Sequence, residues 1–200
     1  MRQDAAQVRW FTQQKIDQIL RAQEAAARAS LANLRRGLGK APGALPQLWG
    51  LTLEGLPEAF LSRDGQPTRA EWAVYTALTL FALHQQGKDL KIECMNRGDN
   101  SLGKAVRMLA SRQEDLPRVK RRFDAAATAD SPAEFANHLK GLVQLLKAKE
   151  IPLDYPALAE DLYFFQFPGA RDSVRLRWGQ DFYRAPREEK TEENQETNQE

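Results

Sequence analysis

Apolar side chains recur at helical spacing along most of the chain, and no alternating run typical of a β-strand interrupts them. This pattern predicts an all-α protein. The expected helices cover residues 4–28, 31–38, 68–86, 131–149, 154–166 and 171–184, and two short basic helices lie between residues 101 and 122.

Capping residues indicate where several of these helices begin. Ser30 is a candidate N-cap for the helix 31–38, and Thr68 with Glu71 has the pattern of a capping box. Ser131 and Asp154 hold the same position before the next two helices. The helix 68–86 is apolar on almost every side, so we expect it at the centre of the core. Its large apolar residues are Trp72, Tyr75, Leu78, Leu80, Phe81 and Leu83.

The turn-forming sequence NRGDN at residues 96–100 is the best candidate for a domain boundary. We therefore expect two small helical bundles, an N-terminal one at residues 1–97 and a C-terminal one at residues 98–185. Residues 186–200 are rich in Glu, Gln, Asn and Thr, so we expect a disordered acidic C-terminal tail.

Positive charge concentrates in residues 101–122, SLGKAVRMLASRQEDLPRVKRR. Helical spacing places Lys104, Arg107 and Ser111 on one face of the first short helix, with apolar residues behind them. The second helix has the same arrangement. A cationic face supported by an apolar one can bind a phosphate backbone without any reactive group, so we expect nucleic-acid contact here. The basic residues are Lys104, Arg107, Arg112, Arg118, Lys120, Arg121 and Arg122, against only Glu114 and Asp115.

A second basic group lies in LRRGLGK, residues 34–40. Arg35, Arg36 and Lys40 stand at a helix C-terminus, where cations offset the helix dipole, and that role accounts for one or two of them. We expect the group also to contact nucleic acid. No base-reading motif accompanies it, so binding should follow the backbone and tolerate any sequence.

The net charge alone does not show whether the protein binds nucleic acid. Residues 187–200 hold two basic and six acidic residues, so the formal charge of +2 for the whole chain corresponds to 27 basic and 21 acidic residues, net +6, before that segment. A charge of this size fits a solvated surface as well as it fits nucleic-acid binding.

No pattern in the sequence indicates catalysis, a metal or a cofactor, although an enzyme is not excluded. His84 and His138 lie on separate helices without metal-ligand spacing, and the adjacent Glu160 and Asp161 should point apart.

Cys94 is the only cysteine, which excludes an intrachain disulfide and fits a reducing cytoplasm. There is no signal-peptide pattern, and the longest apolar stretch, residues 72–83, is shorter than the roughly 20 residues that span a bilayer. We expect a cytoplasmic protein with no membrane partner.

Two groups of aromatic residues have alternative roles. Trp178, Phe182 and Tyr183 alternate with arginines, so they could stack on bases or pack the last helix onto the core. Packing is favoured. Trp49, in a loop rich in Pro and Gly, could contact a partner, but an anchoring role for the loop is favoured.

Five segments in their order resemble the small-subunit family (CasB) of the type I-E CRISPR surveillance complex, Cascade. The resemblance extends over residues 8–183, approximately, and no single motif in it is diagnostic. The segments are LRRGLGK at residues 34–40, SLGKAVRMLA at 101–110, KRR at 120–122, IPLDYPALAEDL at 151–162 and VRLRWGQDFY at 174–183.

This resemblance implies a non-catalytic protein of two small helical bundles, which pairs head to tail with a second copy of itself. The pair would lie against the Cascade backbone subunits that coat the guide RNA, near the large subunit. Its basic surface would support the target DNA strand and the displaced non-target strand once the R-loop opens. The positions carried over are Arg35, Arg36, Lys104, Arg121 and Arg122, and Lys140 lies where the family often has a basic residue.

Two other classes of protein remain as alternatives. A stand-alone helical DNA-binding regulator would need a recognition helix that contacts bases. In a protein-interaction scaffold, the charges would only solvate the helices. Binding of the purified chain to single-stranded DNA at low salt, insensitive to sequence, would distinguish the Cascade subunit from both.

Overall fold

The computed structural model describes residues 1–184, and these form nine α-helices with no β-strand among them. The all-α prediction is confirmed. The expected disordered tail, residues 186–200, lies outside the described residues. The helices are α1 (Arg2–Arg21), α2 (Glu24–Arg36), α3 (Trp49–Thr52), α4 (Arg69–His84), α5 (Leu102–Met108), α6 (Leu116–Ala127), α7 (Pro132–Ala148), α8 (Tyr155–Phe165) and α9 (Pro168–Tyr183). Three short 3₁₀ turns are η1 (Pro46–Leu48), η2 (Glu58–Phe60) and η3 (Gln113–Asp115).

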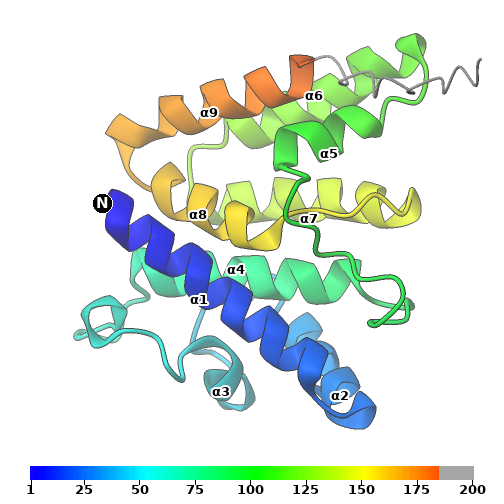
Figure 1. Ribbon diagram of the computed structural model, residues 1–200. Helices are drawn as coiled ribbons and strands as arrows, with labels where there is room; N and C mark the ends of the chain where they lie inside the picture. The colour runs from blue at the N-terminus through cyan, green and yellow to red at the C-terminus, as the bar shows by residue number, and fades with distance from the viewer. Residues whose placement is uncertain (185–200) are drawn as a thin grey trace, which may run out of the picture.

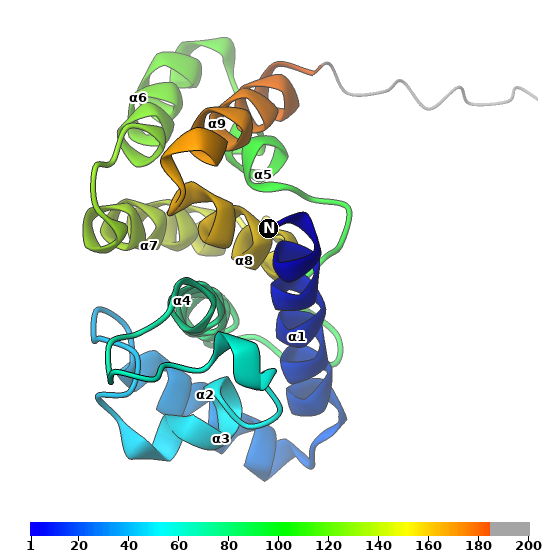
Figure 2. The same cartoon turned by 90° about the vertical axis from the view of Figure 1, so that its left-hand side faces the viewer.

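The helices are arranged in three tiers (Figures 1 and 2). Helices α5, α6 and α9 form one outer tier, α7 and α8 the middle, and α1 to α4 the other side. Helices α1 and α4 pack against α8, α4 also packs against α7, and α7 contacts α6. Buried apolar residues from both halves of the sequence therefore form one continuous core. The division into bundles at residue 98 stays a prediction.

Helix α4 is the central element, as its apolar pattern predicts. Leu78 and Phe81 are 0% exposed, and Tyr75 is also buried. The capping box is present, because the Thr68 hydroxyl accepts from the N–H of Glu71 and the Glu71 carboxylate accepts from the N–H of Thr68. Satisfying these N–H groups fixes where the helix begins.

The boundaries expected for the first two helices are wrong. Instead of one helix over residues 4–28, the chain breaks at Ala22, whose backbone is extended, and α2 begins at Glu24. Ser30 therefore lies inside α2 and caps nothing. The residues around the break favour helix, so tertiary packing overrides local propensity. The turn lets Ile19 of α1 and Leu34 of α2 both reach the core.

The loop after α2 is tied closely to α4. The Tyr75 hydroxyl donates to the Gly37 carbonyl at 2.8 Å. A Cβ on Gly37 would lie 2.6 Å from that hydroxyl oxygen, so the contact requires glycine. Further along, Leu48 is buried, whereas Trp49 is 50% exposed. Leu48 thus anchors this loop to the core, whereas the indole N–H of Trp49 donates only to the Gly43 carbonyl within the loop, at 3.4 Å, so the expected anchoring of the loop on the core by Trp49 is wrong.

The predicted turn at residues 96–100 is present, and it is hydrogen-bonded to the chain before α8. The N–H of Arg97 donates to the Leu153 carbonyl at 3.1 Å, and the N–H of Tyr155 donates to Oδ1 of Asn96 at 3.0 Å. These bonds hold α4, the turn and the start of α8 together. None of the helices in residues 1–184 combines the length and apolarity needed to cross a membrane.

Candidate nucleic-acid interface

Helices α5 and α6 present basic side chains over a buried apolar side, as the sequence predicts. On α5, Leu102 and Val106 are buried and Lys104 is exposed. On α6, Val119 and Phe123 are buried, and the Phe123 ring stacks on Phe182 with centroids 5.4 Å apart. The basic residues of both helices are therefore carried by elements fixed in the core.

Ser111 does not share the face predicted for it. Helix α5 ends at Met108, so Ser111 lies in the connection to η3. Beyond the end of the helix, Leu109 and Ala110 are buried. The face formed by Lys104 and Arg107 is thus only about one turn shorter than expected.

Three of the seven basic residues in this region form local ion pairs. Exposed pairs of this kind contribute only about 0–1 kcal/mol, so a phosphate could replace the carboxylate at small cost. The pairs are Arg112 with Glu114 at 3.3 Å, Arg118 with Asp115 at 3.1 Å, and Lys120 with Asp124 at 2.6 Å.

The other four have no carboxylate partner within residues 1–184. Lys104 Nζ donates to the Asp99 carbonyl at 3.1 Å, and an Arg107 guanidinium nitrogen donates to the Ala110 carbonyl at 3.2 Å. Arg121 and Arg122 are exposed. A phosphate could therefore bind any of these four side chains without displacing a described carboxylate.

The aromatic residues of α9 divide between the two predicted roles. Trp178 and Phe182 are buried, and the indole N–H of Trp178 donates to Asp161 Oδ2 at 2.6 Å. Packing is confirmed for both. Tyr183 is 65% exposed and stays available on the surface.

The arginines of α9 are largely engaged within the protein. Arg175 Nε donates to the Ala127 carbonyl at 2.6 Å, and Arg171 Nε donates to the Phe165 carbonyl at 3.0 Å. Arg177 pairs with the buried Asp161. Burial raises the pKa of Asp161 to about 6, although Arg177 and Trp178 act in the opposite direction. These arginines hold α9 in place rather than presenting a free cationic face.

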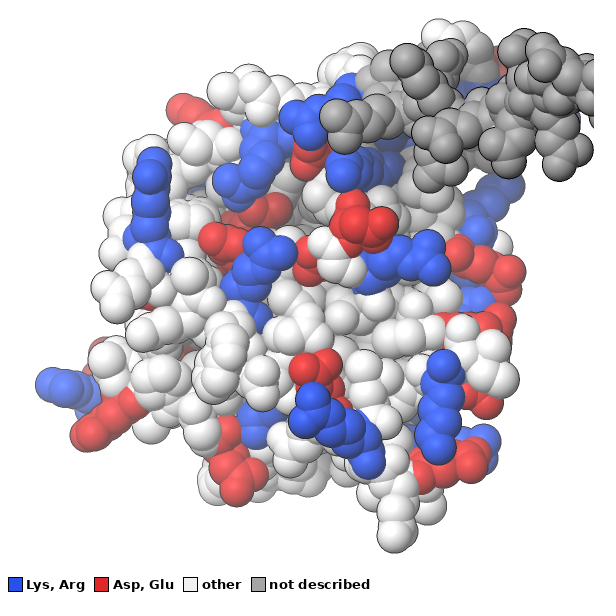
Figure 3. Space-filling model, viewed as in Figure 1, with Lys and Arg blue, Asp and Glu red and all other residues white. Residues whose placement is uncertain are grey.

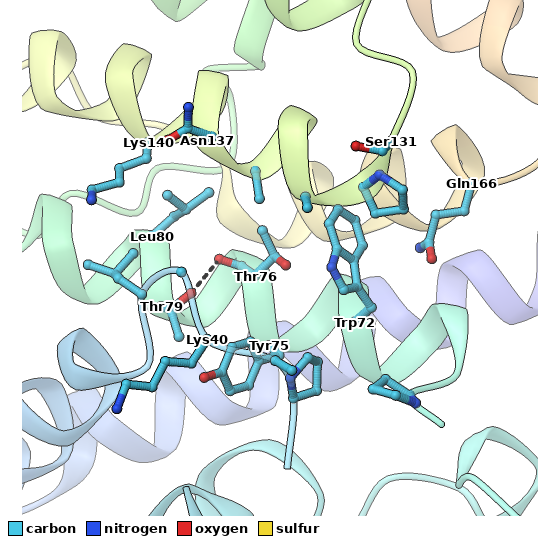
Figure 4. A pocket seen from close by; sticks show the side chains of 18 residues that line it. Lys40, Trp72, Tyr75, Thr76, Thr79, Leu80, Ser131, Asn137, Lys140 and Gln166 are labelled. Carbon is cyan, nitrogen blue, oxygen red and sulfur yellow. Dashed lines mark hydrogen bonds between the residues drawn. The ribbon is translucent and has the colours of Figure 1, made fainter. Parts of the chain in front are cut away.

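The second basic group lies on the other side of α7. Lys40 and Lys140 both line a cleft of about 670 Å³ between the loop after α2, helix α4 and helix α7 (Figure 4). Arg36 is the last residue of α2, directly before this loop, and its guanidinium donates to Asn33 Oδ1 at 3.4 Å. Residues distant in the sequence, 40 and 140, are thus brought to one site.

Lys147 and Lys88 extend this second group and were missed in the sequence. Burial lowers the pKa of Lys147, and the nearby charges of Arg35 and Lys88 lower it further. Lys88 is paired with Glu150 at 2.6 Å. Lys140 and Lys147 are seven residues apart on α7, and this helical spacing was the signal available in the sequence.

The two basic groups lie on different tiers. Helices α5 and α6 are at one end of the molecule and α2 is at the other, with α7 between α6 and α4 (Figure 1). The face drawn in Figure 3 carries acidic side chains among the basic ones. The positive charge is therefore distributed in separate groups, and this face is not one uniform patch.

The residues considered in the sequence as candidates for catalysis or metal binding make structural contacts or are buried. His84 is fully buried, and its Nδ1 lies 2.9 Å from the Tyr155 hydroxyl. Burial raises the pKa of the Cys94 thiol, which disfavours the reactive thiolate. Glu160 pairs with Arg9 while Asp161 turns to Trp178, so the two carboxylates point apart as expected. Within residues 1–184, no three His, Cys, Asp or Glu side chains gather as metal ligands.

Comparison with known proteins agrees with the all-α fold. Residues 30–183 match the family described as CRISPR-associated protein Cse2. The chain belongs to the Cse2 (CasB) family. The resemblance seen in the sequence is confirmed.

Solved structures of this family are similar over most of their length. The crystal structure of CasB from Thermobifida fusca shares 34% identity over 89% of this chain and 98% of its own, with a TM-score of 0.74. CasB from M. ruber shares 20% identity over 86% and 92%, with a TM-score of 0.65, and that likeness shows the fold alone. Among curated proteins, none matches this chain.

Proposed function

We propose that this chain is the non-catalytic small subunit of a type I-E CRISPR Cascade complex in antiviral defence. Its basic surfaces would bind the nucleic-acid backbone and stabilise the R-loop. Membership of the Cse2 family supports the place in the complex. The binding role is supported mainly by Arg121 and Arg122. Both are exposed, neither forms an ion pair with a carboxylate in residues 1–184, and both lie on α6, which the buried Phe123 anchors in the core.

The mechanism is electrostatic. Guide–target pairing reads the sequence, and opening the R-loop exchanges one duplex for another of similar stability. Contacts to the opened strands can therefore tip the balance. Each Lys or Arg that displaces a counterion steepens the salt dependence of binding by about 0.7–0.9 in log–log slope. A handful of such contacts changes affinity by orders of magnitude over a modest salt range.

The proposed contacts come from both basic groups, to either the target or the displaced strand. Residues already in weak surface pairs can exchange a carboxylate for a phosphate. The full set is Arg35, Arg36, Lys40, Lys104, Arg107, Arg112, Arg118, Lys120, Arg121, Arg122 and Lys140.

The proposed partners are the Cascade backbone and large subunits, the guide RNA with its target DNA, and a second copy of this chain placed head to tail. Anchoring in such an assembly raises the effective concentration of each basic residue near the DNA. The isolated subunit can therefore bind nucleic acid weakly and still contribute strongly in the complex.

The experiment is R-loop formation by the complex reconstituted with Arg121→Ala and Arg122→Ala together. We expect assembly and thermal stability like the parent, with faster loss of the R-loop. Arg63→Ala with Lys91→Ala is the matched control, because it removes two exposed charges from loops outside both basic groups. If the double arginine variant keeps the R-loop like the parent, these residues are not contacts. Protection of one operator sequence by the free chain would instead favour a DNA-binding regulator. A variant that fails to assemble, with no other change in DNA binding, would favour a protein-interaction scaffold.

A further inference from the structure

The cleft between α4 and α7 combines two features that backbone binding does not require. It is hollow, with a volume of about 670 Å³, which is within the range of small-ligand sites. It is also lined by a tryptophan. Trp72 of α4 stands among the cleft residues in Figure 4, with Ser131, the N-cap of α7, and Lys140 of α7 on the opposite wall.

Part of the Trp72 side chain is open to a ligand. Trp72 packs against the hydrophobic core, as the sequence predicts, but it is only partly buried, while its neighbours Ala73 and Val74 are 0% exposed. The hydrogen bond drawn among the cleft residues runs within α4, from the Thr79 hydroxyl to the Thr76 carbonyl. The indole N–H thus donates to none of the residues that line the cleft.

The charges of the cleft have one sign. Lys40 comes from the loop after α2 and Lys140 from α7, so the two cations lie on opposite walls at one end of the cleft, and their side chains extend away from Trp72 (Figure 4). No Asp or Glu is among the residues lining the cleft. A neutral apolar peptide would gain nothing from two unpaired cations, whereas a phosphate would be attracted by both.

We propose that this cleft captures one unpaired nucleotide of a single strand, with its base stacked on Trp72 and its phosphates near Lys40 and Lys140. Stacking on an aromatic ring suits any base, because every base has a π-face. The amide of Asn137, which also lines the cleft, can hydrogen-bond a base edge. This inference rests on the proposed function and adds to it a contact with the base.

The loop that carries Lys40 is held so that the cleft is already formed. The Tyr75 hydroxyl donates to the Gly37 carbonyl at 2.8 Å, and Tyr75 itself lines the cleft. A preformed site avoids the entropy of ordering a loop on binding.

The test is binding of the full chain to oligo(deoxythymidine) at low salt, compared with the same oligonucleotide in which spaced thymines are replaced by abasic sites. Stacking of one base is worth a change of about 5- to 150-fold in affinity. We expect the abasic oligonucleotide to bind more weakly by a factor in this range. Trp72→Leu should lose this difference and Trp72→Phe should keep most of it. Trp49→Leu, at an exposed tryptophan outside the cleft, is the matched control and should behave like the parent.

A second measurement locates the base directly. With 5-bromodeoxyuridine in the oligonucleotide, irradiation should cross-link the base to a peptide containing Trp72, and mass spectrometry identifies it. Cross-links confined to α5 and α6, with no abasic effect, would overturn the cleft and leave the proposed function standing. Absence of any oligonucleotide binding by the free chain would overturn the cleft as a nucleotide site, whereas the R-loop experiment with Arg121→Ala and Arg122→Ala tests the proposed function separately. If Trp72→Leu folds, binds DNA like the parent and fails only to join partner subunits, the cleft is a protein docking site and the proposal is wrong.

Discussion

The hydroxyl of Tyr155 lies 2.9 Å from Nδ1 of His84, and this contact joins the end of α4 to the start of α8. The same hydroxyl lies 3.3 Å from the Leu80 carbonyl. Both side chains are 0% exposed, and the Nε2 atom of His84 has no hydrogen-bond partner within residues 1–184. The two halves of the sequence therefore meet at a buried polar group that is costly to charge.

Acid should destabilise the fold through His84. Burial lowers the pKa of this imidazole to about 4, and the charges of Lys88 and Lys147 act in the same direction. The unfolded chain takes up the proton near pH 6.5, and the folded chain only near pH 4, so the folded state loses stability as pH falls through this window. The loss approaches about 3 kcal/mol at the acid end. Urea denaturation at several pH values measures it.

Replacement of His84 by Gln isolates this effect, because Gln can hydrogen-bond Tyr155 without titrating. Asp161 contributes with the opposite sign: burial raises its pKa to about 6, so its contribution to stability decreases as pH rises from about 4 to 6. This contribution is common to both proteins and cancels in their comparison. Equal pH slopes in the parent and His84→Gln would show that the imidazole does not set the acid sensitivity.

The salt dependence of DNA binding should report Arg121 and Arg122. If each contacts one phosphate of single-stranded DNA, Arg121→Ala with Arg122→Ala reduces the log–log salt slope by about 1.4 in total. Fluorescence anisotropy with single-stranded DNA between low and moderate salt measures the slope. Lys120→Ala should reduce it less, because Lys120 is paired with Asp124 at 2.6 Å and exchanges one partner for another. An unchanged slope in the double variant would place these arginines away from the DNA.

Leu139→Ala should separate the core from the surface of α7. Leu139 is 0% exposed, so its truncation leaves a cavity and costs about 2–5 kcal/mol in the free energy of unfolding. Gln144→Ala, at an exposed position of the same helix, should change stability by less than about 0.5 kcal/mol. Chemical denaturation of both variants measures these changes. Similar free energies of unfolding for the two would mean that α7 does not bury the face that carries Leu139.

Much of the fold follows from local patterns in the sequence. The apolar circumference of α4 and its capping box predict a buried central helix, and burial of Phe81 confirms it. The break between α1 and α2 could not be predicted in the same way. The residues on both sides favour helix, and only the need for Ile19 and Leu34 to reach one core bends the chain.

The basic residues of the candidate site could be predicted from the sequence, but their arrangement in space could not. Runs of basic residues identify α5 and α6, and their apolar spacing indicates which side faces out. Lys40 and Lys140 are far apart in the sequence, however, and only the packing of α4 against α7 places them in one cleft. The half-buried state of Trp72 has the same origin. An apolar helix pattern says that a residue is inside, but not that a hollow lies beside it.

The position of Lys104 depends on a close contact between α5 and α9, and Gly103 makes that contact possible. A Cβ at Gly103 would clash with the Trp178 carbonyl oxygen and lie 2.9 Å from Cβ of Asp181. Because the nearest atom belongs to helix backbone, it cannot move alone, and Gly103→Ala should cost about 1–3 kcal/mol by overpacking. Gly141→Ala is the control, since its Cβ meets nothing within 4 Å and helix propensity should stabilise it by about 0.5–1 kcal/mol. Opposite signs in the shift of the denaturation midpoint confirm the close packing, and a neutral Gly103→Ala would show that α5 and α9 stand further apart.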